Sequence, residues 1–162
     1  MPALAGYWTL DETSGQRVDS SGRGNHLADY NTVGSAAGQV GLAADFESDR
    51  YEYLSISDGG QSGLDVAGSL TLVGWMRPES VGDWQVLAGK YAFDGENDRA
   101  YRLDLRPGDL MGFIVSPDGS FSSGYLLEAS LSSSLSSGTW YHVAGVFDAV
   151  AGTMAVYVDG EM

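Results

Sequence analysis

The sequence predicts an all-β protein folded as a two-sheet antiparallel β-sandwich. Glycine supplies 23 of the 162 residues, about twice its average usage, and shows no Gly-X-Y period, so the chain contains many turns. Roughly nine or ten short apolar or alternating segments follow one another at hairpin spacing, and none has the periodicity of a helix. Because a sheet must bury one face against another layer, two stacked antiparallel sheets are the simplest solution.

The N-terminal third is expected to hold short strands joined by loops. Leu4–Leu10 is mainly apolar and predicts a first strand, which the polar turn Asp11–Gly15 ends. Residues 28–41 are small and polar, which is typical of a loop with one short strand. Leu42–Phe46 and Tyr51–Ile56 are predicted to pair with each other as two antiparallel strands.

The middle of the chain predicts the strongest strands. Ser69–Arg77 is apolar almost throughout and is followed by Pro78, so it is interpreted as a central strand. A further strand is expected over Trp84–Tyr91. Tyr101–Arg106 alternates, which places Tyr101, Leu103 and Leu105 inward and leaves Arg102, Asp104 and Arg106 on a solvated face. Leu110–Val115 is expected to return beside it, with Met111, Phe113 and Val115 on one face.

The C-terminal part predicts a loop and then a hairpin. Residues 120–137 contain nine serines in eighteen positions, which favours a loop with at most a short strand at Tyr125–Leu127. Thr139–Asp148 and Gly152–Glu161 are expected to pair, with alternate side chains of the second strand facing the core. The dipeptide Asp159-Gly160 is typical of a tight hairpin turn.

Charge and composition exclude several classes of partner. The formal net charge is −14, with a single lysine, Lys90, which argues against nucleic acid and against anionic membranes. No apolar run is long enough for a membrane-spanning helix, and no signal peptide is recognisable at the start of the chain. The absence of cysteine excludes disulfides and thiolate metal sites but leaves the compartment open. The acidity fits either a solubility device or carboxylates gathered at a cation site.

An ordered set of short motifs carries a family resemblance. The motifs, in chain order, are Gly6-Tyr-Trp-Thr-Leu-Asp-Glu-Thr-Ser-Gly15, Asp19-Ser-Ser-Gly-Arg-Gly-Asn-His26, Gly41-Leu-Ala-Ala-Asp-Phe46, Leu70-Thr-Leu-Val-Gly-Trp75, Thr139-Trp-Tyr-His-Val-Ala144 and Tyr157-Val-Asp-Gly160. Together they cover nearly the whole chain, which resembles the laminin-G-like, concanavalin A-like lectin-glucanase jelly-roll domains. The resemblance implies one domain over residues 1–162, a module of a larger extracellular or cell-surface protein.

The end of the chain departs from the family pattern. Members usually continue past the Asp-Gly turn, with a final strand beside the N-terminal one, whereas only Glu161 and Met162 follow here. The chain is therefore expected to be a jelly roll whose last strands are missing and a piece of a longer parent protein. It is also expected to be less stable than the complete domain, or to pair through an exposed sheet edge.

No residue pattern supports catalysis. Related β-glucan-cleaving enzymes carry Glu-x-Asp-x-(x)-Glu along one strand, since glycoside hydrolysis needs paired carboxylic acids. The seven glutamates here are scattered, and Glu52 has no acidic partner at strand spacing. His142 is interpreted as a packed strand residue and His26 as a surface loop residue. No catalytic residue is therefore predicted.

Calcium is the one cofactor that the sequence suggests. The loop Asp19-Ser-Ser-Gly-Arg-Gly-Asn25 supplies a carboxylate, an amide and glycines that let backbone carbonyls turn inward. Carboxylate, amide and backbone oxygens are the ligands that calcium prefers. In resembling domains this loop often carries a structural calcium, which makes Asp19 and Asn25 candidate ligands. The alternative is an Asx-turn that organises the loop through its own hydrogen bonds. A second acidic run, 94–98, is interpreted as a solvated hairpin loop because Arg99 and Leu105 stand where a calcium loop needs glycine and glutamate.

Aromatic residues are the candidates for ligand contact. Sugar binding usually needs an aromatic platform with polar groups around it. Trp84, Tyr91 and Phe93 are the predicted ligand-binding residues, and Tyr125 is a weaker candidate near a loop. Trp75 and Trp140 are expected to fill the core between the sheets.

The function predicted from the sequence is a non-catalytic binding or adhesion module. By resemblance, its ligand is expected to be a glycan, with an extracellular protein as the other partner class. The alternatives are a structural spacer or protein-interaction domain without a small ligand, and a glycoside hydrolase-related domain.

Overall fold

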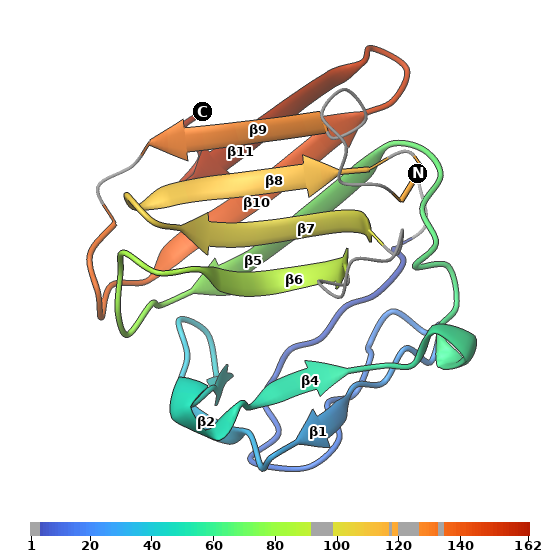
Figure 1. Ribbon diagram of the computed structural model, residues 1–162. Coiled ribbons are helices and arrows are strands. Elements are labelled where there is room, and N and C mark those ends of the chain that lie inside the picture. The colour runs from blue at the N-terminus through green and yellow to red at the C-terminus, as the bar shows by residue number, and fades with distance from the viewer. Residues whose placement is uncertain (1–3, 92–98, 117, 120–126, 133–134) are drawn as a thin grey trace. The chain divides into compact units, whose positions relative to one another are not determined.

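The chain forms two compact units that divide after Asp65. Figure 1 shows the computed structural model, which describes residues 4–91, 99–116, 118–119, 127–132 and 135–162. Strands dominate both units, and helical structure within the described residues is limited to two single 3₁₀ turns, Ser48–Arg50 and Asp58–Gly60. The all-β prediction is therefore confirmed. No helix among the described residues has the length and apolarity needed to cross a membrane.

Unit 1, the N-terminal one, contains two small antiparallel ribbons. Its strands are β1 (Ala28–Tyr30), β2 (Gly34–Ala37), β3 (Leu42–Asp45) and β4 (Tyr53–Ser55). Strand β1 pairs with β4, and β2 pairs with β3. The prediction that Leu42–Phe46 and Tyr51–Ile56 pair with each other is wrong, because both find partners within 28–37, where only one short strand was expected.

The predicted first strand over Leu4–Leu10 does not form. Only an isolated bridge joins Trp8 to Asp19. Two local features explain the difference. The backbone N–H of Tyr7 donates to the Asp19 carboxylate instead of to a neighbouring strand, and Leu10 has a φ of 61°, a left-handed conformation that extended strands do not contain. The apolar residues alone were therefore not enough to form a strand, because the Asp19 side chain accepts the Tyr7 N–H that would otherwise pair with a neighbouring strand.

Unit 2 is a sandwich of two antiparallel sheets. Its strands are β5 (Leu70–Met76), β6 (Gln85–Tyr91), β7 (Arg99–Arg106), β8 (Leu110–Val115), β9 (Leu127–Ser132), β10 (Tyr141–Asp148) and β11 (Thr153–Val158). One sheet has the order β6-β7-β8-β9 and the other β11-β10-β5. In Figure 1 the four-stranded sheet lies in front of β10 and β5. Strand β9 corrects the prediction of a loop over the serine-rich stretch, since it pairs along the whole of β8.

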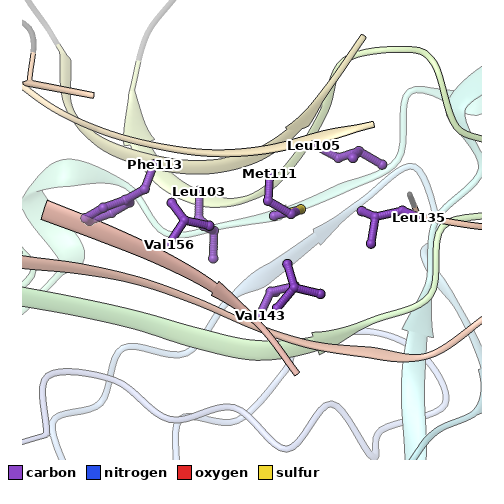
Figure 2. Close-up of a cluster of buried hydrophobic side chains, with 8 residues drawn as sticks. Leu103, Leu105, Met111, Phe113, Leu135, Val143 and Val156 are labelled. Carbon is purple, nitrogen blue, oxygen red and sulfur yellow. The ribbon is translucent and has the colours of Figure 1, made fainter. Parts of the chain in front are cut away.

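The hydrophobic core of unit 2 lies between these two sheets. Figure 2 shows the side chains of β7 and β8 pointing toward those of β10 and β11. The buried residues of this core are Leu103, Leu105, Met111, Phe113, Leu135, Val143, Val156 and Val158. The inward faces predicted for β7, β8 and β11 are therefore confirmed. Gly145 on β10 matters to this contact, because a Cβ there would lie 2.5 Å from the ring of Phe113 on β8.

The outer faces of the two sheets differ from the prediction. Arg102, Asp104 and Arg106 were expected on a solvated face, but all three are buried, at 3%, 0% and 8% exposure. Trp75 was expected in the core, but it is 47% exposed on β5. Its strand lies at one end of the described β11-β10-β5 order, although Ser69–Arg77 was interpreted as central. The mainly apolar strand β5 therefore exposes a tryptophan to solvent, whereas the charged face of β7 is buried.

Candidate functional site

The predicted calcium loop of unit 1 is organised around the side chain of Asp19. One carboxylate oxygen, Oδ1, accepts hydrogen bonds from the backbone N–H groups of Tyr7 (3.0 Å) and Ser21 (2.8 Å). The other, Oδ2, accepts from the Ser21 hydroxyl (2.8 Å) and from the Asn25 N–H (2.9 Å). An ionised carboxylate offers about four lone-pair positions, so these four donors use them all.

Asn25 fixes the other end of the loop. Its side chain is fully buried, and its amide nitrogen donates to the carbonyl oxygens of Ala5 and Ser62 at 2.8 and 2.9 Å. Its amide oxygen accepts from the N–H of Ser62 at 2.7 Å. The Asn25 carbonyl also accepts from the indole N–H of Trp8 at 2.7 Å. The loop therefore ties together three segments of unit 1 that are distant in sequence.

The charge of Asp19 is stabilised by these bonds. Burial alone would raise the pKa of Asp19, but the hydrogen bonds from Tyr7, Ser21 and Asn25 outweigh burial and hold this pKa well below its usual value. His26 takes part as well, since its Nδ1 accepts from the Asp19 N–H at 3.0 Å. His26 lies in the loop, as predicted, where it is half-buried and its ring is bonded to the loop backbone.

This donor set does not fit a calcium ion. Calcium needs six to eight oxygens with lone pairs directed at it, but the hydrogens of N–H and O–H groups point at both oxygens of Asp19. Within the described ranges no three His, Cys, Asp or Glu side chains lie close enough together to hold a metal ion. The acidic run 94–98 lies outside the described residues. Calcium binding at Asp19 and Asn25 stays a prediction.

The second candidate site lies in unit 2, on the face of β6 and β7 that points away from the core. We call it the Trp84 cluster: Trp84, Tyr91, Arg102, Asp104 and Arg106. Asp104 is completely buried and accepts a hydrogen bond from the Nε of each arginine, at 2.6 Å from Arg106. The opposite charges at alternate positions of one strand therefore form a single arginine–aspartate–arginine bridge.

Aromatic rings cover the guanidinium groups of this cluster. The Cζ of Arg102 lies 4.3 Å from the centroid of the Tyr91 ring and 5.4 Å from that of Trp84. The Cζ of Arg106 also lies 5.4 Å from the Trp84 ring. These are cation–π distances, so Trp84 rests on two charged groups that are themselves held by Asp104. Trp84 nevertheless remains 59% exposed.

Two glycines make room for the arginines. At Gly112 on β8 a Cβ would lie 2.2 Å from the Arg106 guanidinium, so the arginine side chain occupies the space that a side chain at position 112 would fill. At Gly89 on β6 a Cβ would lie 3.1 Å from the Cα of Arg102 and 2.7 Å from the carbonyl oxygen of Tyr101. Gly112 therefore leaves the space that the Arg106 guanidinium occupies, and Gly89 lets β6 approach the backbone of β7 closely beside Arg102.

The predicted ligand-binding residues are brought together in part. Trp84 and Tyr91, seven positions apart in sequence, both contact Arg102. Phe93 and Tyr125 lie outside the described residues. Trp75 contacts His142 of β10 in a T-shaped arrangement at 5.2 Å, on the outer face of the other sheet.

Trp140 lies directly before β10, and His142 lies among its first residues. Trp140 is half-buried, and the Arg77 Cζ lies 5.4 Å from its ring centroid. It was expected in the core but is not one of the core residues. His142 occupies a β10 position, as predicted, and its backbone N–H donates to Oδ1 of Asp159.

Sequence reasoning missed the arginine–aspartate–arginine bridge. Alternation was interpreted only as one buried and one wet face, although charges of opposite sign at every second position can neutralise one another. A second signal was present in composition. Four of the chain's eight cationic residues, Lys90, Arg99, Arg102 and Arg106, fall in β6 and β7. That concentration in a protein of net charge −14 marks this sheet as chemically distinct.

Comparison with known proteins identifies the family. A laminin G family model, described as the concanavalin A-like lectin/glucanases superfamily, matches residues 48–162, from the end of unit 1 through unit 2. Comparisons with curated proteins and with solved structures gave no match. The match spans well over half of the chain, and the two-sheet sandwich of unit 2 agrees with it. The chain belongs to the laminin-G-like branch of the concanavalin A-like lectin/glucanases superfamily.

Proposed function

We propose that this protein is a non-catalytic carbohydrate-binding module and that Trp84 is its main contact with the sugar. The observation that carries the proposal is an exposed indole ring on a rigid, buried, charged base. Trp84 is 59% exposed, whereas the arginines beneath it are almost fully buried. A flat aromatic face with fixed polar groups beside it suits a sugar ring, which has an apolar face and hydroxyl groups at its rim.

The base beneath Trp84 supports binding because it limits the motion of the ring. Arg102 and Arg106 both contact the indole, and Asp104 fixes the Nε atoms of both arginines. A side chain that is held in place before the ligand arrives loses less conformational entropy on binding. The arrangement therefore favours recognition by stacking.

The chemistry of Asp104 favours a binding role over a hydrolytic one. Glycosidases need one carboxylic acid that can donate a proton and a second carboxylate that can attack or act as a base. Asp104 is fully buried, and each of its oxygens accepts a hydrogen bond from a guanidinium group. This carboxylate organises the arginines beneath Trp84 and is not presented to a substrate.

The proposed setting is an extracellular or cell-surface protein in which this module acts as an adhesion element. The support is the family, whose members include lectins, and the acidic composition, which does not suit nucleic acid or anionic membrane partners. Cell fractionation of the natural host, with the protein followed in the medium, at the cell surface and inside the cell, tests this location.

A glycan array probed with the full chain tests the ligand class. We expect the wild-type protein to retain a defined set of glycans and Trp84→Ala to lose them, with Trp84→Phe keeping part of the signal. Trp75→Ala is the matched control, because Trp75 is also exposed, at 47%, but lies on the other sheet of the same unit. Binding that survives Trp84→Ala, or no glycan bound by the wild type, would refute the proposal. Release of reducing sugar from β-glucans would instead support a hydrolase.

A further inference from the structure

We propose that Asp19 closes the unit 1 loop as a hydrogen-bond hub and that this loop holds its structure without calcium. The inference concerns unit 1 and is independent of the carbohydrate proposal, which rests on the Trp84 cluster. It chooses between the two interpretations that the sequence left open for Asp19-Ser-Ser-Gly-Arg-Gly-Asn25, a cation site and an Asx-turn.

Both carboxylate oxygens of Asp19 are already occupied by hydrogen-bond donors. Both Asp19 oxygens accept two hydrogen bonds each, from Tyr7, Ser21 and Asn25. A calcium ion on either oxygen would have to displace an N–H or O–H group, and each displaced donor that stayed buried would cost about 1–3 kcal/mol. The positive ends of four dipoles already balance the carboxylate charge, which is the balance that a cation would otherwise provide.

The hydrogen bonds of Asp19 and Asn25 take the structural role that a metal ion would have in this loop. A structural calcium ion holds a loop in place by binding several of its oxygens at one point. Here Asp19 joins the loop to Tyr7, and Asn25 joins it to Ala5 and Ser62. Asn25 is fully buried and uses both hydrogens of its amide group in these bonds. The segment with Ala5 and Tyr7, the loop and the segment near Ser62 are thereby held at one point.

Thermal unfolding of the full chain gives the first test. We expect the same melting temperature in EDTA and in millimolar CaCl₂, or a shift of equal size in wild type and Asp19→Asn, since an acidic surface can bind calcium elsewhere. Asp49→Asn is the control for charge, because Asp49 is an exposed acid in the same unit. A calcium-dependent rise in wild type that is absent in Asp19→Asn would overturn the proposal.

Trp8 provides a second, local test. Its indole N–H is bonded to the carbonyl of Asn25, so a Tb³⁺ ion bound by this loop would lie beside an indole that can sensitise its emission. We expect the indole-sensitised Tb³⁺ emission of the wild type to be unchanged in Trp8→Phe and in Asp19→Asn. Emission that disappears in both variants would place a cation in the loop and overturn the hub.

Ser21→Ala keeps the proposal testable if Asp19→Asn does not fold. This change removes one donor to Asp19 and leaves the carboxylate in place. We expect a lower melting temperature by the same amount in EDTA and in calcium. An unchanged melting temperature would show that the hydroxyl bond does not support the loop, and a loss seen only in EDTA would show that calcium does.

Discussion

Asp104→Asn provides the sharpest test of the buried bridge beneath Trp84. Asp104 has no exposed surface and accepts a charge-assisted hydrogen bond from each of two buried arginines, Arg102 and Arg106. Asparagine has nearly the same shape, but it lacks the negative charge, and its NH₂ group would face a guanidinium donor with another donor. The substitution therefore removes the electrostatic partner without creating a cavity.

The expected loss of stability is about 3 kcal/mol. Each hydrogen bond to a charged group contributes about 1.5–3 kcal/mol, and asparagine keeps one acceptor oxygen. Removing one partner of a buried ion pair typically costs about 3–5 kcal/mol, so the two lines of reasoning agree near the lower value. With a urea m-value of about 2 kcal/mol/M, the unfolding midpoint should fall by about 1.5 M.

Urea unfolding followed by tryptophan fluorescence measures this loss, because Trp84 contacts both arginines. Glu79→Gln is the control, since it makes the same change of charge at an exposed position of unit 2. Replacing all three charged residues of the bridge by apolar residues of similar size should restore much of the stability, because the buried charges would then be gone. A loss of unfolding free energy below about 1 kcal/mol for Asp104→Asn would show that Asp104 does not stabilise the two buried arginines.

Three further predictions concern the core and unit 1. Gly145→Ala should cost about 1–3 kcal/mol, because its Cβ would clash with Phe113, whereas Gly74→Ala on β5 meets open space and should cost less; chemical denaturation of both variants measures the difference. Arg17→Lys should destabilise the chain by about 2 kcal/mol, because the buried guanidinium donates to the carbonyl oxygens of Gly15, Val33 and Gly34 and an ammonium group cannot reach all three. The melting temperature measured by calorimetry should fall. A melting temperature equal to that of the wild type would contradict this role of Arg17. Asp19 should make the stability of the chain sensitive to acid: because the pKa of Asp19 is depressed in the folded state, its stabilisation is complete above about pH 5 and is lost as the pH falls below the unfolded pKa of about 3.9 toward the folded pKa. The difference in unfolding free energy between wild type and Asp19→Asn should therefore narrow over that range. A difference that stays constant down to about pH 3 would refute this prediction.

The inward faces of the strongest strands could be predicted from the sequence. Alternation along Tyr101–Arg106 and Leu110–Val115 places Leu103, Leu105 and Phe113 on one side, and the structure buries them there. The hairpin of β10 and β11 was predictable for the same reason, because Met154, Val156 and Val158 alternate along its second strand and the connection between the two strands is short. Periodicity works in these segments because each strand has one face that must leave water.

Strand pairing in unit 1 was not predictable. Strands β3 and β4 are three or four residues long and pair with β2 and β1, and no local pattern distinguishes this from a direct β3–β4 pair. Short strands with small side chains carry little register information. Likewise, the serine-rich composition of 120–137 concealed β9, whose pairing with β8 is a property of the sheet and not of its own residues.

By itself the sequence determined the all-β class and the family motifs, because these depend on side-chain type and local spacing, and it predicted which aromatic residues contact a ligand. Only the tertiary structure decided what covers the charged face of β7. Arg102, Asp104 and Arg106 form a buried bridge under Trp84, and Gly112 of β8, opposite Asp104, leaves the space that the Arg106 guanidinium occupies. Cross-strand neighbours, which no single strand encodes, turn the alternation of a solvated strand into the base of the proposed binding site.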